Sequence, residues 1–491
     1  MISSRIKKMD NTSIEIKVKY RPKLKGKVNI RKYSVETYIF LPVELGINKR
    51  NFTNIDFYRE YKNHLKIDPP KVLLSEIAER THGFMINYNS IVERFDVNNK
   101  DSVETLDDNT RILLNVYKKA IKREVQKIIK YSEPDEKIRV ATRLIKNIDL
   151  SIENYRNRQN SILDITHKEC KINKTISIGN EYISNLKYRF FHEAILHLID
   201  DGDIAYYSVI EALRLSLDME IEYRKQNNFP LSSTVKKENE NLIKRWNIIK
   251  YFISNKLIIK AKIDKDSRYL EEILYSFAAG IAMVFATGIA FYYNQKFGNF
   301  TLSFFVVLVL SYMFKDRIKE WGRSFFSSIL QKQLLDHHYN LYDDNNVKIG
   351  VSKDGFEFIP QTSLTKKIND LRYSEELLIK ELMNHEEKVM KFTRKININM
   401  RQFIKTFGRI DLRGINDVIT LNFAPIIMRM QDTIFPVYAM NSKGKIKTIN
   451  SEKTYPINIV QAISIDKQTH YQHYTVNVAK SGIKKLEVIK K

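Results

Sequence analysis

Two long runs without charged residues dominate the hydrophobic pattern of the chain. They extend from Ile273 to Tyr293, 21 residues, and from Phe297 to Phe314, 18 residues. A helix of roughly 20 apolar residues crosses a hydrocarbon core of about 30 Å. Because only a few residues separate the runs, the pattern predicts a two-helix transmembrane hairpin. Two buried helices of a soluble domain are the alternative.

Basic residues outside the two runs predict how such a hairpin is oriented. Lys296 is the only cation between the runs, whereas the outer flanks are rich in Lys and Arg. After the second run the cations are Lys315, Arg317, Lys319 and Arg323. The positive-inside rule then predicts an integral two-pass protein with both the N- and the C-terminus in the cytoplasm. Neither run contains Asp, Glu, Arg or His, which disfavours a pump or coupled transporter, so we interpret the hairpin as an anchor.

Small residues in the first run predict a close neighbour. Ala282, Ala286 and Ala290 recur every four residues and therefore share one helix face. Small side chains at this spacing allow another helix to approach closely. The second run is the expected neighbour, and self-association of the hairpin into a homodimer is the alternative.

Near the N-terminus, residues 14–28 alternate between apolar and basic positions. A period of two predicts a half-buried strand, and Pro22 places it at a sheet edge or beside a bulge. Six cations fall on one face of this strand: Lys17, Lys19, Arg21, Lys23, Lys25 and Lys27. We interpret this face either as a solvated edge that resists pairing or as a contact for anionic lipid or phosphate. A further strand is expected over Val35 to Leu41.

The next 200 residues show helical periodicity. Leu106 to Tyr131 has one apolar face, and Pro134 marks the start of a second helix that continues to about Ile165. The other face of the first helix is basic and adds candidate lipid or polyanion contacts at Lys118, Lys119, Lys122, Arg123 and Lys127. Three more amphipathic helices are expected over Glu181 to Ile199, Ile204 to Lys225 and Val235 to Asn255. A basic helix face is also typical of plain solvated surface.

After the apolar runs, the pattern changes from helical to extended. Lys315 to Leu335 predicts a basic juxtamembrane helix, and Asp354-Gly355 predicts the turn of a β-hairpin. A long helix is expected over Ser363 to Arg394. Its imperfect heptads allow packing on its own chain or a homodimer through 368–396. The strands expected beyond it are Val418 to Phe423, Phe435 to Met440, Lys445 to Ile449, Ile457 to Ile465, Tyr474 to Val478 and Lys485 to Ile489.

Together these elements predict an α+β membrane protein of five segments. A transmembrane hairpin separates a mainly helical N-terminal cytoplasmic region, with a short β-rich start, from a C-terminal region of long helix and small β-sheet. The predicted segments are 1–64, basic and β-rich; 65–268, helical; 269–335, hairpin and juxtamembrane helix; 336–400, β-hairpin and long helix; and 401–491, a small β-rich domain.

Charge and cysteine content narrow the class of protein. The 491 residues include 82 Lys and Arg against 57 Asp and Glu, a net charge of +25. This surplus predicts an anionic partner, either nucleic acid or a membrane surface. Cys170 is the single cysteine, which excludes an intramolecular disulfide and a zinc site made of several cysteines.

Candidate chemistry is sparse. His192, Glu193, His197, Asp200 and Asp201 form a weak metal-ligand candidate on a predicted helix. The two histidines are five positions apart, so the H-E-x-x-H spacing that places two ligands on one helix face is not met. A surface polar cluster is the alternative. Phosphate-binding glycine loops and the G-x-S-x-G turn do not occur in the sequence, so no cofactor is predicted.

These observations lead to one functional hypothesis and two alternatives. The first is a membrane-anchored, cytoplasmic-facing, non-catalytic scaffold or sensor whose basic surfaces contact anionic headgroups or a partner. The second is a membrane-tethered nucleic-acid-binding protein, which depends on the same charge. The third is a metal-dependent hydrolase built on the His192 cluster.

Overall fold

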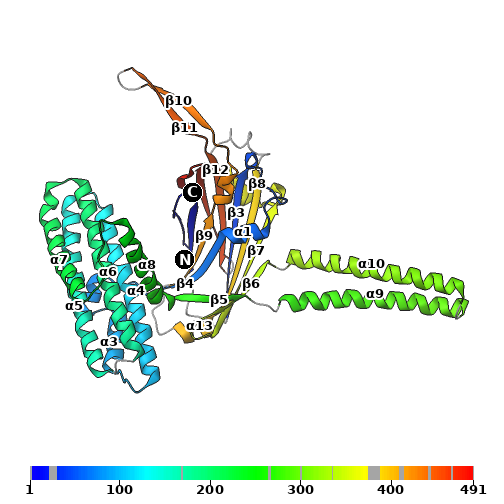
Figure 1. Cartoon of the computed structure of the whole chain (residues 1–491), viewed down its shortest axis with the longest axis horizontal. Coiled ribbons are helices and arrows are strands. Elements are labelled where there is room, and N and C mark those ends of the chain that lie inside the picture. Colours follow the sequence, from blue (N-terminus) through cyan, green and yellow to red (C-terminus); the bar gives the residue numbers. More distant parts are fainter. Residues whose placement is uncertain are drawn as a thin grey trace. The chain divides into compact units, whose positions relative to one another are not determined.

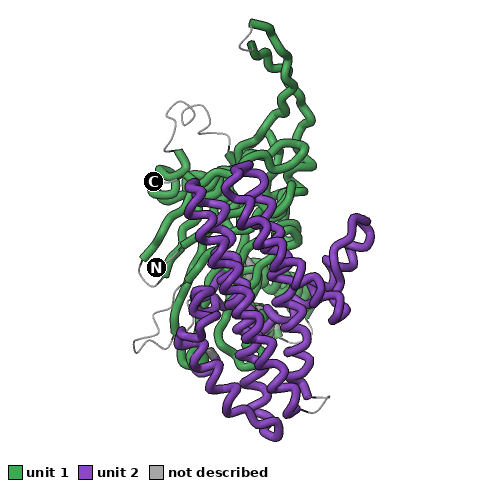
Figure 2. Tube along the Cα trace, turned by 90° about the vertical axis from the view of Figure 1, so that its left-hand side faces the viewer, with its two compact units in different colours: residues 1–65, 259–404, 417–491 green, residues 66–258, 405–416 purple. Residues whose placement is uncertain are grey.

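The computed structural model describes residues 3–20, 30–166, 170–263, 267–298, 301–333, 335–373, 387–407, 414–440, 444–465 and 468–489. The chain divides into two compact units (Figure 2). The sheet unit consists of Met1–Leu65, Ile259–Ile404 and Asp417–Lys491, and the helical unit of Lys66–Ile258 and Lys405–Asn416. Each unit is described by itself below.

Twelve strands form one sheet in the order β1-β2-β9-β4-β5-β6-β7-β8-β3-β12-β13-β14 (Figure 1). Every pair from β5 round to β14 is antiparallel. The strands are β1 (Ser3–Lys8), β2 (Ser13–Tyr20), β3 (Ile30–Pro42), β4 (Tyr61–Asp68), β5 (Ile258–Ile263), β6 (His337–Tyr342), β7 (Lys348–Ile359), β8 (Glu387–Asn399), β9 (Gly414–Asn422), β12 (Tyr455–Ile465), β13 (Gln468–Ala479) and β14 (Gly482–Ile489). Strands β10 (Ile434–Met440) and β11 (Ile446–Glu452) form a separate two-stranded ribbon.

The two ends of the long sheet meet, so that it is nearly closed. The Ile483 amide at the start of β14 donates to the carbonyl of Asn11, in the turn between β1 and β2, at 2.7 Å. Tyr474 Oη on β13 donates to Ser4 Oγ on β1 at 2.8 Å. Gly482 has φ +124°, and a Cβ there would lie 2.5 Å from the Asn11 carbonyl oxygen. Glycine is therefore required where the ends approach.

The alternation predicted near the N-terminus is confirmed in β2. Ile14, Ile16 and Val18 are buried on one face, and Lys17 and Lys19 on the opposite face are half-buried. β2 lies between β1 and β9, so it is β1 that occupies the end of the sheet order. The other four predicted contact residues of this strand lie outside the described residues: Arg21, Lys23, Lys25 and Lys27.

The N- and C-terminal β segments belong to one sheet. β3 pairs with β12 on one side, with Val35 opposite Ile463, and with β8 on the other. The expected strands after Val418 are all present as β9 to β14. The predicted small C-terminal sheet is therefore wrong in its size, because strands from both ends of the chain belong to one twelve-stranded sheet.

Two elements before β9 differ from the prediction. The hairpin turn at Asp354-Gly355 is wrong, since β7 runs straight through it and buries Asp354. The long helix expected over Ser363 to Arg394 is also wrong, since α11 covers only Lys366–Arg372 and β8 begins at Glu387; residues 374–386 lie outside the described residues. β8 is buried on both faces over much of its length. Such a strand lacks a period of two, and its apolar spacing resembles that of a helix.

Helices α9 (Ser267–Phe297) and α10 (Leu302–Gln333) connect β5 to β6 and lie side by side, antiparallel (Figure 1). Ala282 and Ala286 are buried, as the small-residue spacing predicts for a close neighbour. Ser311 Oγ on α10 donates to the Ala286 carbonyl at 3.1 Å. The close neighbour of the alanine stripe is therefore α10.

The predicted two-pass transmembrane hairpin is not supported. Within the described residues, only Glu272–Lys296 on α9, 25 residues, is long and apolar enough to cross a membrane. α10 begins at Leu302, so just 13 helical residues precede Lys315. Thirteen residues at about 1.5 Å each reach about 20 Å, less than a hydrocarbon core of about 30 Å. The fold is α+β without a two-pass hairpin. The predicted localisation as a two-pass integral membrane protein is therefore wrong.

The helical unit is a bundle whose amphipathic helices match the predicted ones. α4 and α6 lie at its centre, and the other helices pack around them. Asn99 caps α4 by accepting the Asp101 and Ser102 amides, and Pro134 opens α5. The helices are α2 (Leu74–Glu79), α3 (Gly83–Glu93), α4 (Lys100–Lys130), α5 (Pro134–Ile165), α6 (Lys171–Asp201), α7 (Tyr207–Gln226) and α8 (Lys236–Asn255). Elsewhere the chain forms α1 (Asn54–Glu60), α13 (Met400–Phe407) and α14 (Ala424–Met428).

A charged cluster lies inside the sheet unit. Arg394 on β8 is buried opposite Asp354 on β7, and its Nη1 lies 3.2 Å from Asp354 Oδ2. Its Nε lies 3.0 Å from Asp417 Oδ2 on β9, and its Nη1 donates to Tyr61 Oη on β4 at 3.1 Å. One guanidinium therefore faces two buried carboxylates and links four strands.

The protonation of Asp417 reflects this shortage of cations. Burial raises the pKa of Asp417 to about 6, although Arg394 acts to lower it. Neither carboxylate oxygen of Asp417 accepts a hydrogen bond from the described residues. Burial lowers the pKa of Arg394, but Asp417, Tyr61 and Asp354 outweigh burial and raise it overall, so the guanidinium stays charged.

We predict that this carboxyl makes the protein more stable as the pH falls through about 6. The folded pKa lies above the ordinary value of 3.8, so the folded state binds more protons between these values. Between pH 7 and pH 5 the free energy of unfolding should rise by about 1–3 kcal/mol from this group. Asp417→Asn should remove that rise in denaturant unfolding. Asp370→Asn, an exposed change in the same unit, is the control, and identical pH profiles for wild type and Asp417→Asn would contradict the prediction.

Candidate functional site

The predicted metal candidate does not form a site. His192, Glu193, His197 and Asp200 are exposed on the last turns of α6, and Asp201 pairs with Lys137 on α5. His192 Nδ1 lies 2.6 Å from the Tyr188 carbonyl oxygen one turn earlier. Across the described residues, no three His, Cys, Asp or Glu side chains are grouped so as to hold a metal ion.

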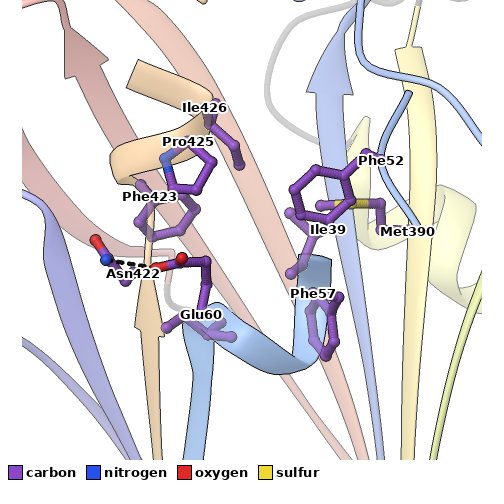
Figure 3. A pocket seen from close by; sticks show the side chains of 10 residues that line it. Ile39, Phe52, Phe57, Glu60, Met390, Asn422, Phe423, Pro425 and Ile426 are labelled. Atoms are coloured by element: carbon purple, nitrogen blue, oxygen red, sulfur yellow. Dashed lines mark hydrogen bonds between the residues drawn. The ribbon is translucent and has the colours of Figure 1, made fainter. Parts of the chain in front are cut away.

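A pocket of about 350 Å³, including its open mouth, lies in the sheet unit (Figure 3). Aromatic and aliphatic side chains form most of its wall. Its polar wall is Glu60 at the end of α1 and Asn422 at the end of β9, and the Asn422 amide donates to the Glu60 carboxylate at 2.6 Å. The lining residues are Ile39, Phe52, Phe57, Glu60, Met390, Leu421, Asn422, Phe423, Pro425 and Ile426.

This pocket is suited to binding rather than to chemistry. The Glu60 carboxylate and the Asn422 amide share one hydrogen bond, and the other lining side chains contribute neither a nucleophile nor a base. Phe57 stacks on Phe356 with 4.2 Å between ring centroids, which fixes one side of the wall. An apolar group is the ligand that such a lining accepts.

The apolar residues of α9 form an exposed surface. Phe277, Val284 and Phe291, seven positions apart and so on one face, are 62%, 74% and 76% exposed. Ala278, Ala282 and Ala286 form the buried stripe against α10. Apolar side chains of α10 extend the surface: Leu302, Phe305, Val306, Val309, Leu310, Met313 and Phe314. Contiguous apolar surface of this kind marks contact with lipid or protein.

The predicted cations of α10 directly follow this apolar surface. Lys315 Nζ lies 4.0 Å from the ring centroid of Tyr312. The Arg323 guanidinium lies 4.9 Å from the ring centroid of Tyr275 on α9. Arg317 and Lys319 are exposed. The cations therefore border the apolar surface and do not interrupt it.

The predicted basic face of α4 separates into two groups. Lys119 pairs with Asp68, and Lys127 Nζ lies 2.8 Å from Glu124 Oε1. Arg123 Nη2 donates to the Val72 carbonyl at 3.1 Å. Lys118 and Lys122 differ, because neither pairs with a carboxylate among the described residues.

Packing of the bundle surrounds Lys118 with further cations. Burial lowers the pKa of Lys118 to about 8, and Lys250, Arg189, Lys122 and Lys119 lower it in addition. Arg189 lies on α6 and Lys250 on α8, and both side chains are exposed. Neither residue was among the predicted contact residues, because both are far from Lys118 along the chain. Only their place on the polar faces of neighbouring helices could have indicated them.

Comparison with known proteins gives no family. No family model, no curated protein and no solved structure matches the chain. The function is therefore argued from the surfaces described above.

We predict that Lys118→Met stabilises the helical unit at pH 7. The folded pKa of about 8 is below the ordinary 10.5, so a charged Lys118 costs stability below pH 8, and this cost disappears as the pH rises from 8 to 10.5. Methionine keeps the apolar stem and removes the charge. The expected gain at pH 7 is about 1–2 kcal/mol in urea unfolding, allowing for solvent screening.

Lys146→Met provides the control, because Lys146 is an exposed lysine in the middle of α5 and its charge is not among those that lower the pKa of Lys118. Its unfolding free energy should stay within about 0.5 kcal/mol of wild type. A loss of stability in Lys118→Met, or equal gains in both variants, would show that Lys118 carries no electrostatic cost.

Proposed function

We propose that this protein is a non-catalytic, membrane-associated binding protein that holds basic side chains against an anionic lipid leaflet. The observation that carries the proposal is the exposed apolar surface of α9 between Glu272 and Lys296. The pocket and the α6 cluster offer no arrangement for catalysis among the described residues. Binding is therefore the activity that the surfaces support best.

The exposed apolar surface of α9 is unfavourable in water. Each Å² of apolar surface exposed to water costs about 25 cal/mol relative to an apolar environment. Phe277, Val284 and Phe291 expose most of their side-chain area on a single face. Contact with the apolar part of a bilayer would remove that cost, and α9 has no charged side chain from Ile273 to Tyr293 that would oppose it.

The cations of α10 add an electrostatic contact. Four cations, Lys315, Arg317, Lys319 and Arg323, follow the apolar part of this helix within nine positions. A cation near an anionic leaflet gains about 1 kcal/mol. Trp321 and Phe325 are exposed among them, and aromatic side chains favour the boundary between headgroups and acyl chains. Apolar and electrostatic contacts would then act on the same helix pair.

We predict that the full chain floats with vesicles, and more so with anionic than with neutral lipid. The vesicles would contain phosphatidylcholine alone or with phosphatidylglycerol. Replacing Phe277, Val284 and Phe291 together by Ser should weaken association at least about tenfold, because three apolar side chains lose their lipid contact. Far-ultraviolet circular dichroism checks that the variant keeps its helices.

Leu196, Leu215 and Met219 on α6 and α7 supply the control, since they are 60%, 66% and 59% exposed. Their replacement by Ser should leave flotation unchanged. Equal loss in both triple variants, or flotation of neither wild type nor variant, would exclude α9 as the contact. Salt-sensitive DNA binding without vesicle binding would instead favour the polynucleotide partner that the net charge also allows.

A further inference from the structure

Lys118 and three further cations of the helical unit lie on three helices that pack against one another. We infer that Lys118 and Lys122 on α4, Arg189 on α6 and Lys250 on α8 form a binding site for a phosphate group. We call these residues the three-helix basic cluster. The inference concerns the helical unit and does not depend on membrane contact through α9.

The packing of the bundle brings the four residues together. Lys118 and Lys122 are one turn apart and share a face of α4. α4 packs against both α6 and α8, and α6 packs against α8. The Asn115 amide on α4 donates to the Ile253 carbonyl on α8 at 2.9 Å, and these two residues lie within one turn of Lys118 and Lys250.

These cations lack the compensation that other lysines of the unit have. Lys187 Nζ lies 2.8 Å from Asp149 Oδ1, and Lys256 Nζ lies 2.7 Å from Asp108 Oδ1. Among the described residues, no member of the three-helix basic cluster has an ion pair with a carboxylate. Like charges gathered without a counter-charge oppose folding, and a bound anion offsets that repulsion.

An aromatic side chain, Trp246, lies beside the three-helix basic cluster. Trp246 precedes Lys250 by one turn on α8, and its ring centroid lies 5.4 Å from the Arg189 guanidinium. The Trp246 Nε1 atom is enclosed and has no hydrogen-bond partner among the described residues. Because that nitrogen is enclosed, Trp246 contributes to the cluster through its ring, which contacts the Arg189 guanidinium.

Phosphate is the anion that these groups fit best. It has several acceptor oxygens and carries up to two negative charges, whereas the cluster offers one guanidinium and three ammonium groups. A dianion beside Lys118 also favours the protonated lysine. The phosphate could come from a lipid headgroup or from a soluble molecule, and the test separates these two sources.

The test uses the full chain and two probes. Titration calorimetry measures binding of soluble myo-inositol hexakisphosphate, and flotation compares vesicles of phosphatidylcholine with and without phosphatidic acid. We expect binding of the soluble probe to weaken at least about tenfold in the double variant Lys118→Met with Lys250→Met, because charge-assisted contacts are lost. The control is Lys236→Met with Lys237→Met, the same charge change on exposed residues of the first turn of α8.

Calorimetry also measures proton uptake on binding, which general charge attraction does not change. Near pH 8 about half of Lys118 is neutral, so a bound anion should draw protons from the buffer. Titration in two buffers of different ionisation enthalpy should reveal proton uptake in wild type and much less in Lys118→Met. Unlike the affinity alone, this proton count identifies Lys118 itself.

Each outcome decides the inference. Loss of binding in the cluster variant but not in the control variant supports the inference. Whether the soluble probe or the phosphatidic acid vesicles show that loss indicates the source of the phosphate. Equal loss in both double variants, or binding of neither probe, overturns it. If both probes fail while wild type still floats with phosphatidylglycerol vesicles, the proposed membrane contact survives alone. Preference for duplex DNA over both probes also overturns the assignment.

Discussion

Arg394 is the residue on which the architecture of the sheet unit depends. It lies on β8, faces Asp354 directly across the β7–β8 ladder, and reaches Asp417 on β9, which is five positions away in the strand order. That contact is only geometrically available because the sheet curves until its interior faces itself. Removing the guanidinium would leave two buried carboxylates without a counter-charge, a far larger cost than loss of the contact itself.

A partly buried charge without a counter-charge also distinguishes the surface around Lys118 in the helical unit. The lysines that the bundle buries most deeply have a carboxylate beside them: Lys187 pairs with Asp149 and Lys137 with Asp201. Lys118 has none among the described residues, and the resulting pKa of about 8 records the cost. Natural proteins retain such local costs where binding needs them. The uncompensated charge around Lys118 is therefore an argument for a ligand.

The apolar surface of α9 and the basic side chains of α10 raise a separate question. Their proposed role rests on exposed apolar area and neighbouring charge, not on the length of a second span. The 13 helical residues of α10 that precede Lys315 are too few to cross a bilayer. Membrane association through α9 and phosphate binding by the helical unit are independent, so either can hold without the other.

The sequence by itself determined the elements whose burial is one-sided. β2 and the helices α4, α5, α7 and α8 were predictable because one apolar face repeats at a period of two or 3.6. It failed for β8 and for Asp354, where burial on both faces or a buried charge removes the period. Only the tertiary structure decided that Lys119 is neutralised while Lys118 gathers Arg189 and Lys250. Such partners are set by which helices pack together, and a linear pattern does not contain that information.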